Sequence, residues 1–584
     1  MTLMRGADAI LETLEAGGVE LVLGYIGHTT QELADASRSR NKLRTMFPAT
    51  EMGGAHVING YNYVKNRAAA AGIWHTCGTM LIPGALYEGM STRIPSVHLG
   101  MNVDGAFKDR EAMQEMPNLE VLKSITRFAT RAERPNKLPE TIYRAIQRAH
   151  GTPAGPTFVD IPFDLTVDVA EMTIPSGWEA PSHRIGAAPD LIQCVVELLL
   201  QAKRPVLVVG GGAVTSGADA QVRELAEMLG IPVTTTHTSQ GVVPESHPLV
   251  LGSTGPIGWA CANDWVSKAD LVVAIGTRLA DWGLAQTYAA GLPGKLVHID
   301  LDAGQLGNFY FPTVGIVGDA RTVLAQLIEA IGHSPDYRAM PFDQHDRYKE
   351  ISASREGWLE AMRSRGASTE TPISPWRIAS AIEAALEPED YIVSDAGNNT
   401  AWIYQGTTSE RSRRLVTTSG AGVLGAGFPM ALGVKLAAPD VNVVAALGDG
   451  GFAYATNEIA FALREKIAVT VIVFNDSALG ANNGFMTYLF GQPTWTALNN
   501  PDFVALAKSY GAEGERVEDP TQLEAAVRRG IASGTVYVID VPISQAFGYP
   551  ATGVGGKVRW EPRQWPSDTI GTLTPQRFDL AEDR

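Results

Sequence analysis

The chain has 584 residues, of which 45% are hydrophobic and 19% charged; this composition is typical of a globular protein, and the length exceeds what one hydrophobic core organises. Its net charge of −16 argues against nucleic acid or an anionic membrane surface as a partner. No apolar run is long enough to span a bilayer, and Cys77, Cys194 and Cys261 are too scattered for a disulfide framework or a zinc site. We therefore expect several domains in a reducing, cytoplasmic setting.

Residues 1–185 alternate helical and strand patterns, which predicts a first α/β domain. Residues 1–18 predict an amphipathic helix that lacks the apolar stretch of a signal peptide. A predicted strand at 20–25 leads to a Gly-His-Thr-Thr run containing His28, and a helix rich in small residues begins at Glu51. By itself, a carboxylate at a helix start is most often a surface group that complements the helix dipole.

Residues 186–340 predict a second α/β domain, in which a strand leads to Gly211 and Gly212 and then to a helix. This pattern is only a weak dinucleotide-binding motif, because Thr215 stands where the third glycine of the motif would be. Residues 341–372 predict a charged helical connector.

Residues 373–550 predict a third α/β domain, which holds the most specific motif of the chain. An apolar run ends in Gly448-Asp449-Gly450-Gly451 at a helix start, and the next predicted strand, 469–474, ends in Asn475-Asp476. Glycines at a helix start leave N–H groups free for a diphosphate, and a carboxylate is a hard oxygen ligand for Mg²⁺. We expect a diphosphate and metal site here, followed by an irregular tail over residues 551–584.

The motifs and their order resemble those of the thiamine-diphosphate enzymes of the acetolactate synthase superfamily, along almost the whole chain. The resemblance implies three doubly wound parallel-sheet α/β domains: pyrimidine, middle and pyrophosphate. It also implies that Mg²⁺ is bound by Asp449, by Asp476 and by the main-chain carbonyl of Ala478, with Asn475 as the alternative to Asp476. The family usually has Asn at the position of Asp476, so the site here gains a negative charge.

The same resemblance assigns roles to residues in all three domains. Glu51 is expected to bind N1′ of the cofactor's aminopyrimidine, Leu424 to hold the cofactor bent, and the Gly422 carbonyl to accept from its 4′-amino group. The other implied thiamine diphosphate contacts are Gly397, Asn398, Asn399, Gly448, Gly450 and Gly451. The middle domain resembles flavin-binding relatives, which implies FAD at Gly211, Gly212, Thr236, Gly255, Arg278, Asp300 and Asp319; the alternative is an empty structural domain.

Within the superfamily, strings such as GYIGHT and PATEMGGAHVINGYNYVKNR are most similar to the branch that hydrolyses cyclohexane-1,2-dione. This similarity implies C–C cleavage of a 1,2-dione to an oxo-acid. Neutral His28 or His75 would take a proton from water, and Gln114 and Asn482 would donate hydrogen bonds to developing alkoxides.

Other functions remain open: an acetolactate-synthase-like carboligase or 2-oxo-acid decarboxylase, a flavin-linked oxidoreductase, or a non-catalytic relative. The family resemblance further implies a homodimer or homotetramer with active sites at the subunit interface, acting on a small-molecule dione or 2-oxo-acid.

Overall fold

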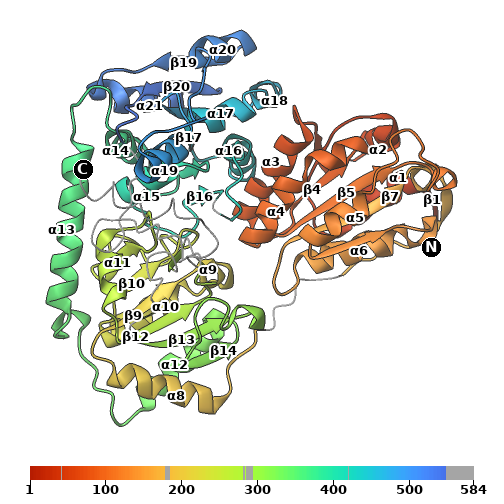
Figure 1. The fold of residues 1–584 in the computed structure, drawn as a ribbon. Coiled ribbons are helices and arrows are strands. Elements are labelled where there is room, and N and C mark those ends of the chain that lie inside the picture. The colour runs from red at the N-terminus through yellow and green to blue at the C-terminus, as the bar shows by residue number, and fades with distance from the viewer. Residues whose placement is uncertain are drawn as a thin grey trace, which may run out of the picture.

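The computed structural model describes residues 1–547 except 41, 178–183, 281–282, 285–291, 293 and 419; the predicted tail lies outside the described residues. Three α/β domains each contain a six-stranded sheet (Figure 1). All strand pairs within these three sheets are parallel, which confirms the predicted fold class. In the described part of the chain, no helix combines the length and apolar character that crossing a membrane requires.

The N-terminal domain has the sheet order β3-β2-β4-β5-β7-β6. Its strands are β2 (Leu21–Gly24), β3 (Arg44–Met46), β4 (Ala70–Trp74), β5 (Ser96–Asn102), β6 (Phe128–Arg131) and β7 (Pro156–Pro162). Its main helices are α1 (Gly6–Ala16), α2 (Gln31–Ser37), α3 (Glu51–Lys65), α4 (Pro83–Thr92), α5 (Asn118–Leu122) and α6 (Leu138–Ala149). The predicted helix over residues 1–18 is wrong at its start, because β1 (Thr2–Arg5) pairs antiparallel with β8 (Val169–Met172).

The C-terminal domain repeats this connectivity, with the order β16-β15-β17-β18-β20-β19. Its strands are β15 (Tyr391–Ser394), β16 (Leu415–Thr417), β17 (Val443–Gly448), β18 (Thr470–Asn475), β19 (Glu513–Arg516) and β20 (Tyr537–Pro542). Its helices are α14 (Pro375–Ala385), α15 (Asn398–Gly406), α16 (Gly427–Ala437), α17 (Asp449–Ala455), α18 (Glu458–Arg464), α19 (Gly480–Phe490), α20 (Phe503–Tyr510) and α21 (Leu523–Ala532).

The middle domain has a different order, β11-β10-β9-β12-β13-β14, which is the doubly wound order of dinucleotide-binding folds. Its strands are β9 (Pro205–Val209), β10 (Val233–Thr235), β11 (Val250–Ser253), β12 (Leu271–Ile275), β13 (Lys295–Asp300) and β14 (Val314–Val317). Its helices are α8 (Pro189–Gln201), α9 (Gly211–Ser216), α10 (Asp219–Leu229), α11 (Ala260–Ser267) and α12 (Ala320–His333). The predicted charged connector contains a long helix, α13 (Tyr348–Gly366), which leads along the edge of the molecule to the C-terminal domain (Figure 1).

Central strands such as β9 and β12 are continuous runs of apolar residues and are buried along their whole length. This is expected of parallel strands that helices cover on both faces. The sequence therefore predicts that these strands lie buried in the interior of a parallel sheet.

Helices α3 and α16 join the N- and C-terminal domains. A Cβ on Gly60 would overlap the backbone of Met430, and a Cβ on Gly433 would overlap the backbone of Val57. One hydrophobic core runs through this contact and includes residues of both domains. The two glycines therefore allow the helices to approach closely, and this contact fixes one domain on the other.

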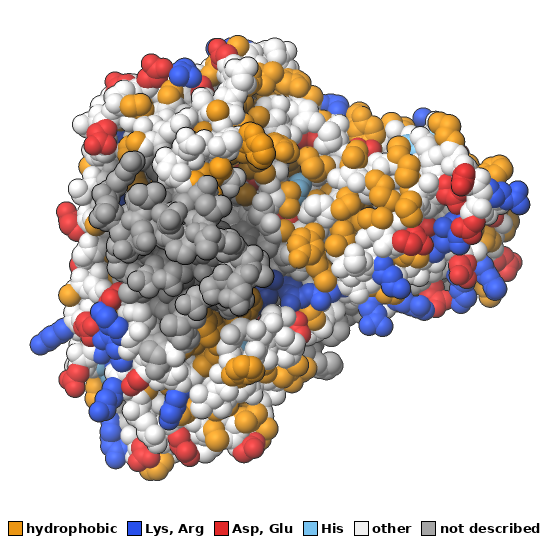
Figure 2. All heavy atoms as spheres, in the orientation of Figure 1, with side chains coloured by type: hydrophobic (Ala, Val, Ile, Leu, Met, Phe, Trp, Pro, Cys, Tyr) orange, Lys and Arg blue, Asp and Glu red, His pale blue; other side chains and the backbone are white. Residues whose placement is uncertain are grey.

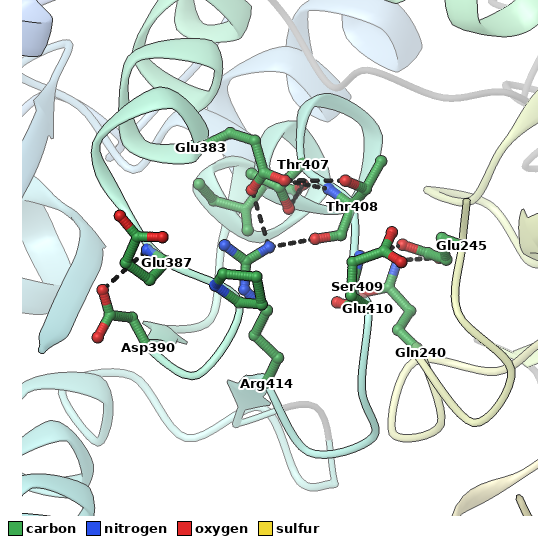
Figure 3. Close-up of polar contacts among 12 residues, drawn as sticks. Gln240, Glu245, Glu383, Glu387, Asp390, Thr407, Thr408, Ser409, Glu410 and Arg414 are labelled. Atoms are coloured by element: carbon green, nitrogen blue, oxygen red, sulfur yellow. Dashed lines mark hydrogen bonds and ion pairs between the residues drawn. The ribbon is translucent and has the colours of Figure 1, made fainter. Parts of the chain in front are cut away.

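A separate polar junction joins the middle and C-terminal domains (Figure 3). Glu245 is fully buried; its carboxyl group accepts the Ser409 N–H at 2.7 Å and the Gln240 side-chain amide at 3.3 Å. Nearby, Arg414 and Glu383 form an ion pair at 2.9 Å. The bond between Glu245 and Ser409 connects the segment between β10 and β11 to the loop after α15, and the ion pair lies on the C-terminal side of this junction.

Candidate active site

The C-terminal sheet reverses its strand order between β15 and β17, and ligands of doubly wound sheets bind in the crevice at such a point. A cavity of about 290 Å³ lies there, formed by the loops that follow β15, β16, β17 and β18. Its lining includes the predicted residues Gly397, Asn398, Asn399, Gly422, Leu424, Gly448, Asp449, Gly450, Gly451, Asp476, Ala478 and Asn482. The structure thus brings four separate segments of the sequence together in one pocket.

Two carboxyl groups in this pocket lie close enough to interact. Burial and the neighbouring charge of Asp449 raise the pKa of Asp476 to about 7, and burial raises the pKa of Asp449 above its usual value. Such a pair fits a divalent cation, which would balance both charges. In the described part of the chain, no cluster of three or more His, Cys, Asp and Glu side chains could hold a metal, so further ligands would have to come from main-chain and diphosphate oxygens.

Asn475 is not among the residues that line the cavity. Its side-chain amide donates to Asp540 at 2.8 Å, and its carbonyl oxygen accepts from Asn500 at 3.1 Å. Asn500 also donates to the Asp449 carboxylate at 2.6 Å. Asn500 could not be predicted from the sequence, because no recognisable motif surrounds it.

The N-terminal sheet has its own reversal point, between β2 and β4. His28 follows β2 and His75 follows β4, and their rings meet edge to face with centroids 4.9 Å apart. The hydroxyl oxygens of Thr29 and Thr76 lie 3.0 and 2.9 Å from His75 Nδ1 and so fix its ring. Burial and the neighbouring His28 lower the pKa of His75, which keeps this imidazole neutral at pH 7.

Glu51 is the first residue of α3, as the sequence predicts, and Thr50 caps the helix by accepting the Gly53 N–H at 3.0 Å. The Glu51 carboxylate packs so closely on Gly78, just after β4, that a Cβ there would overlap it. Gln114 has a backbone φ of +67° and contacts Thr76 at 3.4 Å.

The predicted catalytic residues therefore form two groups. Glu51, His28, His75 and Gln114 lie at the reversal point of the N-terminal sheet, whereas Asn482 lines the C-terminal cavity. Among the described residues, those that line this cavity all belong to the C-terminal domain. One chain thus presents two half-sites.

The residues proposed for FAD follow strands of the middle sheet. Gly211, Gly212, Thr236, Gly255, Arg278 and Asp300 lie at or just after the carboxyl ends of β9 to β13, the edge at which doubly wound sheets bind nucleotides. In the described structure, the buried side-chain atoms Thr235 Oγ1, His237 Nε2 and Ser253 Oγ have no hydrogen-bond partner at this edge. These features fit a dinucleotide.

Asp319 differs from the other residues of this set. It caps α12 by accepting the Thr322 N–H at 3.1 Å, and its carboxylate also accepts from Ser216 at 2.9 Å and Arg184 at 3.1 Å. These bonds give Asp319 a structural role in the middle domain.

Comparison with known proteins identifies the family. Residues 4–121, 192–327 and 395–541 match, in this order, the N-terminal TPP binding domain, the central domain and the C-terminal TPP binding domain of thiamine pyrophosphate enzymes. The chain belongs to the thiamine pyrophosphate enzymes. The matches together cover more than half of the chain and agree with its three sheets, so the protein is a thiamine-diphosphate-dependent enzyme.

Several similar thiamine pyrophosphate enzymes are acetolactate synthases. A probable acetolactate synthase large subunit of Methanocaldococcus jannaschii is 29% identical, over 95% of this chain and 94% of its own length. The acetolactate synthase large subunit of Corynebacterium glutamicum is also 29% identical, over 90% of this chain and 84% of its own length. Acetolactate synthase 1 of Zea mays chloroplasts has the same identity, over 92% and 85%. The chain therefore resembles these acetolactate synthases over at least 90% of its length.

Proposed function

We propose that this enzyme is an acetolactate-synthase-like carboligase, which uses thiamine diphosphate and Mg²⁺ to act on a 2-oxo-acid such as pyruvate. The observation that carries the proposal is the similarity to acetolactate synthases over more than 90% of both chains in the case of the Methanocaldococcus relative. The pocket at the C-terminal reversal point supports it, because its donor set suits a diphosphate and a divalent cation.

When bound, thiamine diphosphate supplies an electron sink for bond changes next to a carbonyl. The turn containing Gly448, Gly450 and Gly451 would receive the diphosphate, and Asp449, Asp476 and the Ala478 carbonyl would hold Mg²⁺. Gly422 and Leu424, on the adjoining wall, would face the thiazolium and pyrimidine rings. Glu51 would hold the proton at N1′ of the pyrimidine ring.

A second copy of the chain would complete each site. The C-terminal cavity contains no N-terminal-domain residue among those described, so the Glu51 that serves it would come from a partner subunit. Figure 2 shows hydrophobic side chains gathered on the visible face of the N-terminal domain and the adjoining part of the C-terminal domain. Ile26 and Tyr454 are 60% and 62% exposed, as a surface that becomes buried in a dimer would require.

FAD would occupy the carboxyl edge of the middle sheet, near the glycines after β9 and the side chains of Thr236 and Arg278. The strand order and the unpartnered buried hydroxyls described above support this placement. A flavin absorption spectrum of the purified enzyme would establish the cofactor, and a flavin-free protein would refute it.

A specific observation favours hydrolytic cleavage of a 1,2-dione as the second candidate. His28 and neutral His75 lie edge to face at the N-terminal half-site, where an imidazole could take a proton from an attacking water. Gln114, on the same half-site, would donate a hydrogen bond to a developing alkoxide.

The experiment supplies the enzyme with thiamine diphosphate, Mg²⁺ and either pyruvate or cyclohexane-1,2-dione, and identifies the products. Consumption of pyruvate with formation of acetolactate supports the carboligase. Consumption of the dione but not of pyruvate, with formation of an oxo-acid, would contradict the carboligase and support the hydrolase.

A further inference from the structure

Two buried carboxylates cross the boundary between the N- and C-terminal domains in opposite directions. Glu88, on α4 of the N-terminal domain, accepts the backbone N–H groups of Gly420 and Ala421, each at 2.9 Å. Glu458, at the start of α18 in the C-terminal domain, accepts the backbone N–H groups of Ala49 and Thr50 at 3.1 and 2.9 Å. Each segment that is held lies directly before a segment assigned to the cofactor.

Glu88 is fully buried and holds the start of the loop that carries Gly422 and Leu424 into the cavity. Burial raises the pKa of Glu88, and backbone N–H groups of residues 420–423 oppose this rise by favouring the ionised form. A Cβ on Gly420 would overlap the Glu88 carboxylate and the side chain of Thr92. The loop thus wraps an anion with its N–H groups, an arrangement that fixes its backbone.

Glu458 is 1% exposed and holds the residues directly before Glu51. Besides the two N–H groups, it accepts the Thr50 hydroxyl at 2.8 Å, and that hydroxyl caps α3. A Cβ on Gly53 would overlap the Glu458 carboxylate. The first turn of α3, and with it Glu51, therefore rests on a side chain of the other domain.

Both groups need to be carboxylates rather than amides. An ionised carboxylate accepts hydrogen bonds from several N–H groups at once. An amide would place its own NH₂ group, which is a donor, next to some of these N–H donors. Neither Glu88 nor Glu458 forms an ion pair within the described parts of the chain, so backbone and hydroxyl dipoles balance their charge, with Arg464 adding a weaker attraction at Glu458. This is a costly arrangement for a merely structural contact between two domains.

We propose that Glu88 and Glu458 are reciprocal positioning residues: Glu88 sets the loop that shapes the thiamine end of the pocket, and Glu458 sets the carboxylate that binds the pyrimidine. The inference rests on the proposed function for the roles of Leu424 and Glu51. It adds that the boundary between the two domains determines the geometry of both half-sites.

The first test compares two ligands of the same cavity, thiamine diphosphate and inorganic pyrophosphate, each with Mg²⁺. In Glu88→Gln, affinity for thiamine diphosphate should fall about tenfold because the loop loses a charged hydrogen-bond acceptor. Affinity for pyrophosphate, which reaches only the turn at 448–451 and the metal, should stay within about twofold of wild type. Equal losses for both ligands, or no loss for either, would overturn the role of Glu88.

The second test uses Glu458→Gln and the exchange of the thiazolium C2 proton with solvent deuterium. Affinity for thiamine diphosphate should stay within about twofold of wild type, while the exchange rate falls about tenfold because Glu51 is misplaced. Wild-type exchange in this variant would contradict the role of Glu458.

Each variant is the matched control of the other, and Glu370→Gln is the exposed control that should change neither readout. If Glu88→Gln fails to fold, Gly420→Ala displaces the same loop and should show the same selective loss of thiamine diphosphate affinity. Wild-type enzyme that binds no thiamine diphosphate would refute the proposed function together with the positioning roles of Glu88 and Glu458. Wild-type binding of thiamine diphosphate, with both variants unchanged, would refute these positioning roles alone.

Discussion

Asn475 is the last residue of β18, and Asp476 is the first residue of the loop that follows it. Asp476 lines the cavity, while Asn475 bonds Asp540 and Asn500. We therefore propose Asp476 as the metal ligand and expect Asp476→Ala to raise the half-saturating Mg²⁺ concentration by about tenfold or more.

Two variants serve as controls for this prediction, with Mg²⁺ titration as the measurement. Asp476→Asn keeps an oxygen ligand and should lose less affinity than Asp476→Ala. Asn475→Ala should leave the half-saturating concentration within about threefold of wild type. If Asn475→Ala is the more damaging variant, the assignment is wrong.

The charge state of His75 leads to a pH prediction for dione cleavage. The base is active when neutral, so activity is lost as pH falls through the His75 pKa, which burial and His28 hold below the ordinary 6.5. Wild-type enzyme should therefore keep its activity to below pH 6.5 and lose it at lower pH; this decline is the acid limb of the pH profile. His75→Asn should lose most of its activity, and its remaining activity should no longer show this acid limb. An acid limb that is unchanged in His75→Asn would exclude this residue as the base.

At the residue scale, the sequence could predict many of the residues that line the cavity, such as Asp449 and Leu424, because they belong to motifs. It could not predict Asn500, Glu88 or Glu458, because their partners are distant in the sequence and only the fold brings them together. These contacts depend on how the domains pack, and no local spacing encodes that.

At the element scale, the crossing of α3 and α16 depends on glycine at the contact. Gly433→Ala would press a methyl group on the backbone of Val57, so we expect a loss of about 1–3 kcal/mol in the free energy of unfolding. Denaturant unfolding measures this loss. Gly332→Ala on α12 is the control; Gly332 is exposed and helical with room for a methyl group, so this variant should be neutral or up to about 1 kcal/mol more stable.

Strand and helix positions could be predicted where periodicity is strong, as for α3 from Glu51 and for the strand before Asn475. Residues 2–5 could not, because their strand exists only through pairing with β8, far along the chain. The local sequence pattern does not show whether a segment pairs with a strand that is distant in the chain.

At the scale of the whole molecule, the buried Glu245 makes the junction of the middle and C-terminal domains sensitive to pH. Burial, with Glu383 and Glu410 nearby, raises its pKa from 4.5 to about 8. The folded state therefore holds this proton more tightly than the unfolded state. The resulting stability is fully present below pH 4.5 and is lost as pH rises toward 8.

The measurement is the Tm between about pH 5 and about pH 8. As pH rises over this range, the Tm of wild-type enzyme should fall further than the Tm of Glu245→Gln, which has no titrating proton at this site. Equal pH dependence in the two proteins would show that Glu245 does not titrate in this range.

The most direct test of the account combines Glu51→Gln and Asp449→Ala chains in one mixed dimer. Each variant alone should fold and be almost inactive. In the mixed dimer, both substitutions fall in one of the two sites, while the other site combines the intact Glu51 of one chain with the intact Asp449 of the other, so activity should return to about half that of the wild-type dimer. A mixed dimer as inactive as its parents would show that both residues of a site come from one chain, and would contradict the proposed architecture.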